Sequence, residues 1–220
     1  MTKQERLKGL YPILEKKFGN PKCALDYETP YQLVVAVILS AQCTDARVNI
    51  VTREFFKVMK EPKDMRKLTL KEVETYIKST GFYKNKAMNL KLNADMMLKR
   101  YNDEIPKTME ELTELPGVGR KTANVVLGEL WGIRTGIVVD THVRRLTGLI
   151  GLAKNEMPEQ IEKELIKWIP KKYWFELSHY LILQGRDKCI ARRPKCQECE
   201  INQFCKYYEK LEKIDKKVGK

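Results

Sequence analysis

The chain has 220 residues, enough for one or two domains with buried cores. Lys and Arg number 42 against 29 Asp and Glu, a formal net charge of +13 that favours a polyanionic partner over the alternative of a merely soluble basic protein. The longest apolar run, residues 33–39, is far shorter than the roughly 20 residues that cross a bilayer, and no signal peptide is visible, so we expect no membrane association and a soluble, cytoplasmic protein.

Apolar residues recur at helical spacing through the first part of the chain. Residues 3–18 form one such segment, in which Pro12 marks a start or a kink. Thr29 precedes a proline, as an N-cap precedes the first helical position, so the Val-rich run ending at Ser40 is expected to be a buried helix. Thr44 caps the next predicted helix.

Two further helices are expected before the middle of the chain. Thr69 and Glu72 form a capping box that begins one helix, and Gly81 ends it. Another helix runs over residues 85–101, where apolar residues again fall on one face.

Residues 112–124 predict a tight hairpin between two helices. A second capping box, Thr108 with Glu111, begins the first helix, and the Leu-Pro step at Pro116 ends it. Gly117 and Gly119 tolerate positive φ, and the second helix begins at about Arg120. The bare amides at Gly117, Val118, Gly119 and Arg120 and the positive helix end form an anion site suited to phosphate. The alternative is an ordinary helix-turn-helix corner.

The remainder of the chain also reads as helical. A short extended piece, residues 136–139, leads to Asp140 and a helix, and Pro158 begins another. The last long helix is predicted over residues 172–184, closed by Gly185, and residues 206–220 form a charged end. Because no β-hairpin signal occurs, the predicted fold class is all-α.

Four of the six cysteines fall within 17 residues, in the spacing C-x6-C-x2-C-x5-C: Cys189, Cys196, Cys199 and Cys205. An intracellular chain argues against disulfides. A zinc site usually has two close pairs, so a [4Fe–4S] cluster fits this spacing better, although zinc stays open. Inside the first spacing, Arg192, Arg193 and Lys195 form a basic loop that a cluster could hold against DNA phosphates. Cys23 and Cys43 are expected to be buried thiols.

Two residues have the chemistry of a catalytic pair, Lys121 near the start of the second hairpin helix and Asp140 at the start of a later helix. A lysine amine that has lost its proton can attack C1′ of a deoxyribose, displace the base and form an imine, which permits strand cleavage by β-elimination. The positive helix end beside Arg120 favours that proton loss. Asp140 would stabilise the cationic sugar and assist proton transfer. The alternatives are a phosphate-contacting or solvated lysine and a simple N-cap.

Taken together, several segments resemble those of endonuclease III, a DNA glycosylase and abasic-site lyase family of the helix-hairpin-helix class. They are residues 115–126, 139–142, 40–45 and 81–87, together with the four-cysteine spacing. The resemblance covers nearly the whole chain, in order.

The resemblance implies a fold and an activity. We expect a helical barrel domain over residues 22–134 and a cluster domain assembled from residues 1–21 and 135–220. Lys121 would be the imine-forming nucleophile, Asp140 its partner, and a [4Fe–4S] cluster the cofactor. The partner would be double-stranded DNA with damaged bases or abasic sites, and the expected activity is excision of oxidised or ring-saturated pyrimidines by a monomer at the nucleoid.

An extruded nucleotide leaves a gap in the duplex, which the family fills with a glutamine and an apolar wedge. Here these would be Gln42 and Phe82, although leucine is common at the wedge position. The alternatives are a polar helix end and a core aromatic. Ser40, Asp45 and His142 are weaker candidates for the substrate pocket, and His142 is equally well explained as a structural histidine.

Related functions make different demands on the sequence. Adenine-mismatch glycosylases resemble this pattern but have a hydroxyl residue in place of Lys121 and a long extra C-terminal domain, and thymine-mismatch glycosylases have tyrosine there. From other classes, a non-catalytic DNA-binding module and a redox sensor remain alternatives.

Overall fold

The computed structural model describes residues 1–19 and 23–218, and it divides into two compact units. One unit contains Met1–Pro21 and Gly136–Lys220, and the other contains Lys22–Thr135. The predicted domain junction at residues 21 and 22 lies outside the described residues. Every regular element in the described part of the chain is an α- or 3-10 helix, which confirms the all-α prediction.

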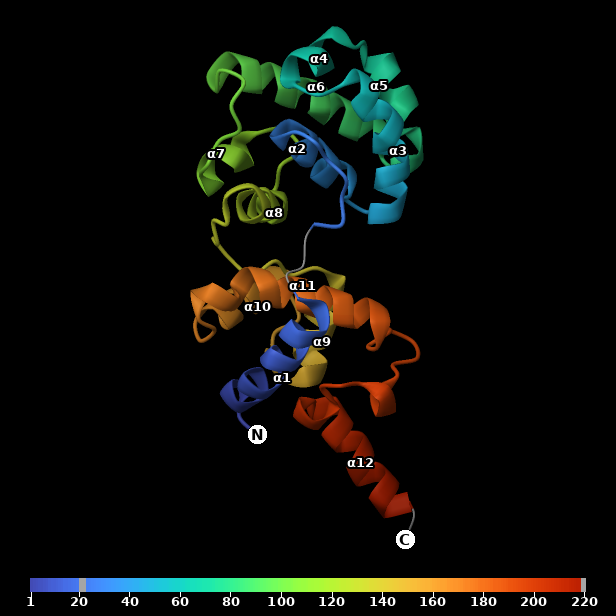
Figure 1. Ribbon diagram of the computed structural model, residues 1–220, viewed down its shortest axis with the longest axis vertical. Coiled ribbons are helices and arrows are strands. Elements are labelled where there is room, and N and C mark those ends of the chain that lie inside the picture. Colours follow the sequence, from blue (N-terminus) through green and yellow to red (C-terminus); the bar gives the residue numbers. More distant parts are fainter. Residues whose placement is uncertain (20–22, 219–220) are drawn as a thin grey trace. The chain divides into compact units, whose positions relative to one another are not determined.

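The Lys22–Thr135 unit contains seven α-helices among its described residues, drawn from blue to yellow-green in Figure 1. They are α2 (Pro30–Leu39), α3 (Asp45–Val58), α4 (Pro62–Lys67), α5 (Leu70–Ile77), α6 (Tyr83–Arg100), α7 (Met109–Glu114) and α8 (Arg120–Trp131). Both α4 and α5 pack along α6, and α2 packs on α8. Because every residue of α2 after Pro30 is buried, α2 forms the centre of this core, as its Val-rich sequence predicted.

Threonine caps begin several of these helices, as predicted. The Thr29 and Thr69 hydroxyls accept hydrogen bonds from the third backbone amide of their helices, completing capping boxes with Gln32 and Glu72. Thr44 caps α3 in the same way. The second predicted box is half formed: Thr108 caps α7, but the Glu111 carboxylate accepts from the Thr108 hydroxyl rather than from its backbone amide.

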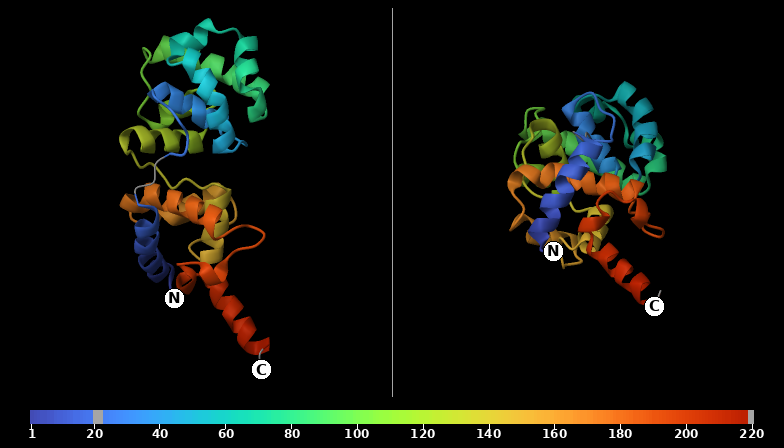
Figure 2. Two further views of the ribbon diagram at one scale, coloured as in Figure 1. Left: turned by 45° about the vertical axis from the view of Figure 1, so that its right-hand side comes forward. Right: turned by 60° about the horizontal axis from the view of Figure 1, so that its bottom comes forward.

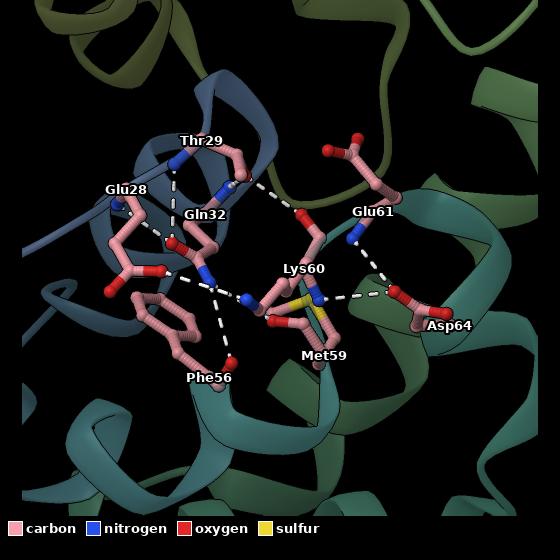
Figure 3. A network of polar contacts seen from close by, with 8 residues as sticks. All are labelled: Glu28, Thr29, Gln32, Phe56, Met59, Lys60, Glu61 and Asp64. Carbon is pink, nitrogen blue, oxygen red and sulfur yellow. Dashed lines mark hydrogen bonds and ion pairs between the residues drawn. The ribbon is translucent and has the colours of Figure 1, made fainter.

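A buried glutamine joins the first capping box to the end of α3 (Figure 3). The Gln32 side-chain oxygen accepts from the backbone amides of Glu28 and Thr29, at 2.7 and 3.2 Å. Its Nε2 donates to the Met59 carbonyl at 3.2 Å, and the Thr29 hydroxyl donates to the Lys60 carbonyl. This network satisfies polar groups that burial would otherwise leave costly, and it fixes where α2 begins.

The other unit combines the N-terminal helix with the C-terminal part of the chain. Its helices are α1 (Lys3–Phe18), α9 (Thr141–Ile150), α10 (Pro158–Ile166), α11 (Trp174–Asp187) and α12 (Lys206–Val218). The blue α1 packs on the orange α11, which also packs on α9 (Figure 2). Tyr11 of α1 lies edge-on against Tyr180 of α11, with ring centroids 5.5 Å apart.

Several boundaries differ from the sequence expectations. The short helix α4 was not predicted, and Gly81 follows a 3-10 turn, Lys78–Thr80, rather than α5 itself. Gly185 lies inside α11 instead of closing it, and the charged end is the helix α12. Pro12 lies inside α1. Among the described residues, no helix combines the length and apolarity that crossing a membrane requires.

Candidate active site and cysteine cavity

The predicted hairpin lies between α7 and α8. The Val118 amide donates to the Leu115 carbonyl at 3.0 Å and closes the turn, while the Asn93 amide group donates to the Pro116 carbonyl at 3.2 Å. Gly117 has φ of +81°, and a Cβ there would lie 3.1 Å from the Asn89 Cβ. Glycine is therefore required at position 117 both by the backbone and by the close approach of α6.

Gly119 has a different role from the one expected. Its φ is −89°, so it does not need glycine for its backbone conformation. It is the N-cap of α8 and supplies no side chain to accept from the first-turn amides. The N-cap side chain therefore does not compete for these amides, and the positive end of the helix macrodipole favours an anion there.

Lys121 and Arg120 lie in the first turn of α8, and both side chains are exposed. The next turn is anchored, because Ala123 and Val126 are fully buried. The backbone of Lys121 is thus fixed by the core, whereas its amine is accessible to a ligand on the hairpin.

Asp140 is the N-cap of α9, in the other unit. Its Oδ1 accepts from the backbone amides of His142 and Val143, both at 2.8 Å. The capping role considered from the sequence is therefore observed. It engages a single carboxylate oxygen, so it is compatible with a further role for Oδ2.

Gln42 and Phe82 share an unusual backbone conformation. Their φ angles are +54° and +47°, in the left-handed region that non-glycine residues rarely adopt. Both residues are exposed, and Phe82 is 67% accessible. A core position for Phe82, the alternative from the sequence, is ruled out by this exposure.

The weaker pocket candidates have structural contacts of their own. The Ser40 hydroxyl donates to the Val37 carbonyl at 2.8 Å, and Asp45 is the first residue of α3. His142 is half-buried, its Nδ1 lies 3.3 Å from an Arg145 guanidinium nitrogen, and burial lowers its pKa. Gly185 makes room for it, because a Cβ there would lie 2.8 Å from His142 Nδ1. These contacts account for His142 as a packed residue of the α9–α11 contact.

The four clustered cysteines line one cavity with Leu146, Ile150 and Ile201: Cys189, Cys196, Cys199 and Cys205. Within the described residues, no three Cys, His, Asp or Glu side chains are grouped to hold a single metal ion. Four thiols around a shared cavity suit a polynuclear group, in which each thiolate binds a different iron. Burial raises the pKa of Cys189 and of Cys205, so these thiols need the charge of bound iron to become thiolates.

Polar contacts around the cavity were not predicted from the sequence. The Gln184 amide nitrogen lies 3.3 Å from the Cys199 sulfur, and Arg145 donates to the Cys189 carbonyl at 2.7 Å. Asn202 donates to the Cys196 carbonyl at 3.2 Å. Such contacts orient ligands and stabilise charge on sulfur. No sequence pattern indicates these contacts, because Arg145 is 44 positions from Cys189 and Gln184 is 15 positions from Cys199.

The basic loop lies between Cys189 and Cys196. Arg192, Arg193 and Lys195 are exposed, and the Lys195 amide donates to the Lys188 carbonyl at 2.9 Å, which closes the base of the loop. The structure thus groups the basic loop, the four clustered cysteines and Asp140 in one unit. It groups the hairpin, Lys121, Gln42 and Phe82 in the other.

Two protein-family models match the chain. The HhH-GPD superfamily of base excision DNA repair proteins matches residues 35–171, a range that includes the hairpin and Asp140. The iron-sulfur binding domain of endonuclease III matches residues 189–205, which begin and end at the outermost clustered cysteines. The cofactor is therefore an iron-sulfur cluster of the [4Fe–4S] type rather than zinc, in accord with the cavity.

Curated relatives and solved structures agree with these models. Endonuclease III of Synechocystis sp. is 45% identical over 93% of both chains, and that of Escherichia coli K12 is 41% identical over 96% of this chain and all of its own. A solved non-covalent endonuclease III–DNA complex matches with a TM-score of 0.89 and 39% identity, covering 97% of this chain and 99% of the other. Identity of this extent, in chains of matching length, shows that this chain belongs to the endonuclease III family of HhH-GPD base excision DNA repair proteins.

Proposed function

We propose that the chain is a bifunctional DNA glycosylase and abasic-site lyase that removes oxidised or ring-saturated pyrimidines from duplex DNA. The observation that carries this proposal is an exposed lysine in the first turn of a helix that has no capping side chain, directly after a glycine-containing hairpin. The relatives' names and the solved complexes with DNA, one of them a trapped covalent intermediate at 40% identity, support it.

The hairpin would bind the DNA backbone and so place the reacting sugar. A phosphate oxygen accepts from the first-turn amides of α8, with Gly117, Val118, Gly119 and Arg120 lining the site. Lys121 is the next residue, so a phosphate held here brings a neighbouring deoxyribose within reach of the amine. Because the hairpin is fixed by packing against α2 and α6, this geometry exists before DNA arrives.

Lys121 is the nucleophile in this proposal. Its neutral amine attacks C1′, the glycosidic C–N bond breaks, and the base leaves with the electron pair and takes up a proton. The sugar ring opens to an iminium joined to the Lys121 nitrogen. Loss of the C2′ proton then expels the 3′ phosphate by β-elimination, and water hydrolyses the imine.

Asp140 is proposed as the carboxylate partner. Its Oδ1 is occupied by two amides of α9, which fixes the carboxylate orientation. Its Oδ2 would stabilise positive charge on the sugar and assist proton transfer. Ser40, Asp45 and His142 are proposed only as neighbours of the extruded nucleotide.

Gln42 and Phe82 are proposed to fill the gap that the extruded nucleotide leaves. An exposed aromatic ring on a strained backbone is costly unless it serves a contact, and insertion between base pairs would supply one. The polar Gln42 side chain would then pair with the base left on the opposite strand.

The [4Fe–4S] cluster would be held by Cys189, Cys196, Cys199 and Cys205, and when bound it supplies a rigid covalent link across the C-terminal segment. The loop with Arg192, Arg193 and Lys195 would be presented to DNA phosphates by this link. We further propose that residues 22–134 form the helical barrel domain and that residues 1–21 and 135–220 form the cluster domain. The protein would act as a monomer in the cytoplasm, at the nucleoid.

Borohydride trapping on a duplex with one thymine glycol tests this function. The wild-type protein should release the base, nick the strand 3′ to the abasic site and become covalently fixed to DNA when the imine is reduced. Lys121→Ala should abolish trapping, whereas Lys71→Ala, at an exposed lysine of α5, should not change it. If the wild-type protein produces neither base release nor a nick, the proposal is overturned.

A further inference from the structure

One buried lysine joins the two loops that carry Gln42 and Phe82. Lys86, in the first turns of α6, is 6% exposed, and its Nζ donates three hydrogen bonds of 2.8 Å each. The acceptors are the carbonyls of Leu39 and Ala41, at the end of α2, and of Thr80, at the end of the 3-10 turn. Lys86 thereby links the two loops through three hydrogen bonds.

The three acceptors account for every proton of an ammonium group. Carbonyls at a helix end lack intrahelical donors, and a cation there also meets the negative end of the helix dipole. In the part of the chain that the structure describes, no salt bridge reaches Lys86. Burial lowers its pKa, as expected for a charge removed from water. A buried charge without an ionic partner is costly, which indicates that these three bonds serve a purpose.

Each of the two loops that Lys86 joins contains a non-glycine residue in the left-handed conformation. Gln42 directly follows the acceptor residue Ala41, and Phe82 comes two residues after the acceptor residue Thr80. Left-handed conformations at non-glycine residues persist only where the surrounding structure enforces them. Ser40 and Cys43 add one further bond, from the Cys43 amide to the Ser40 carbonyl at 3.1 Å, within the first loop alone.

We propose that Lys86 is a positioning residue that locks both loops in the conformation in which Gln42 and Phe82 enter the duplex together. This inference rests on the wedge role given to those two residues in the proposed function. Unstacking a base pair costs free energy. If the two loops became ordered only on binding DNA, the loss of their conformational entropy would add to this cost. With both loops fixed by one ammonium group, that ordering is complete before DNA binds.

The chain contains a matched control on the same helix. The Lys91 ammonium donates to the carbonyls of Met65, Arg66 and Leu68, around the end of α4, and so also caps a helix with three bonds. None of the three residues that supply these carbonyls is proposed to touch DNA. Removing either ammonium deletes the same number of hydrogen bonds from the same unit. Of the two lysines, only Lys86 bonds to the wedge loops, residues 41–43 and 80–82.

The first test measures loop order without any activity. Amide hydrogen exchange is compared in the intact protein, loaded with its cluster, for the wild type, Lys86→Met and Lys91→Met. In Lys86→Met the amides of residues 41–43 and 80–82 should exchange about tenfold faster or more, because charged hydrogen bonds to those loops are lost. In Lys91→Met the increase should be confined to residues 65–68. Unchanged exchange in the wedge loops of Lys86→Met would overturn the inference.

The second test measures whether the order of the two loops contributes to nicking at an abasic site. An abasic site is presented in a full duplex and in a duplex that lacks the opposite nucleotide, where no wedge is needed. Lys86→Met should lose about 10²-fold of single-turnover nicking on the full duplex, and much less on the gapped one. Lys86→Gln, which keeps two donors and is the safer variant for folding, should fall between. Lys91→Met should keep the wild-type ratio between the two substrates.

The outcomes separate the inference from the function on which it depends. Wild-type inactivity on both substrates would overturn the proposed function and the wedge role with it. Wild-type activity together with an unchanged full-to-gapped ratio in Lys86→Met and Lys86→Gln would overturn the positioning role alone.

Discussion

The unit that contains the hairpin, Lys22–Thr135, and the cysteine segment, residues 188–205, are held in place by different means. In the Lys22–Thr135 unit, the nine residues Tyr31–Leu39 are all buried, and the hairpin packs against this helix. In residues 188–205, the two 3-10 turns Cys196–Glu198 and Asn202–Phe204 contain no buried residue. The first region is fixed by apolar packing, whereas the second has four thiols around a cavity.

This difference indicates how each candidate site is built. Lys121 obtains its position from a core that the chain forms by itself. Residues 188–205 contain one buried apolar residue, Ile201. We therefore expect the basic loop to depend on the cofactor, because so little apolar burial does not offset the entropy of ordering the segment. Each region should therefore fail under a different substitution.

Removal of a cysteine ligand should have the largest effect and should be confined to the cysteine segment. We expect Cys196→Ser to lose most of its iron and its visible absorbance, and residues 188–205 to lose protection from proteolysis. Cys43→Ser, at a half-buried thiol of the other unit, is the control and should retain full iron content. Equal iron loss in both variants would remove the distinction between the two regions.

A substitution that creates a cavity in the apolar core should lower the stability of the protein without loss of iron. Leu90, on α6, is fully buried, so Leu90→Ala should lower the free energy of unfolding by about 2–5 kcal/mol. Iron content should not change, since Leu90 belongs to the unit that lacks the four clustered cysteines. Urea unfolding measures the stability, and Leu92→Ala, at a side chain 48% exposed on the same helix, should cost far less. A loss of iron in Leu90→Ala would contradict the independence of the two regions.

Local sequence signals predicted the helices that begin with a cap. Thr29, Thr44 and Thr69 each begin a helix at the expected residue, because the cap and the first turn lie within a few positions of each other. The helix α4 was missed, since its six residues carry too little periodicity. Gly185 was misread as a helix end, because its partner, His142, is distant in the sequence.

The same limit applies to the candidate site. The hairpin turn and the start of α8 followed from Pro116 and the glycines, which act through their own backbone. The exposure of Phe82 and the three bonds of Lys86 depend on which segments α6 meets in space. A buried lysine has no sequence signature, so this part of the site emerged only from the fold.

A smaller effect is expected where α9 and α11 meet beside the cysteines. At Gly185 an added Cβ would lie 2.8 Å from His142 Nδ1 and 3.1 Å from an Arg145 nitrogen, so Gly185→Ala should destabilise the protein by about 1–3 kcal/mol. Gly148→Ala is the matched control, because it lies inside α9 with nothing within 4 Å, and it should stabilise by about 0.5–1 kcal/mol. Thermal unfolding of both variants gives the signs, and destabilisation by both would contradict the packing argument.

The smallest expected effect is a pH dependence of stability in the unit that contains the four clustered cysteines. Burial alone would raise the pKa of Glu164, but hydrogen bonds from Lys3, the Lys154 amide and Asn155 hold it at about 2. The folded-state pKa lies below the ordinary value of 4.5. This carboxylate therefore stabilises the fold at pH values above 4.5, and the contribution is lost as the pH falls toward 2. The stability difference between wild type and Glu164→Gln should therefore shrink as the pH falls from about 4.5 toward about 2, by under about 1 kcal/mol for a partly exposed ion pair. Lys3→Met should reduce the same dependence, since the Lys3 Nζ lies 2.6 Å from the Glu164 carboxylate and is one of its main partners. A difference that grows as the pH falls would reverse the sign and show that Glu164 is not held as a carboxylate by these donors.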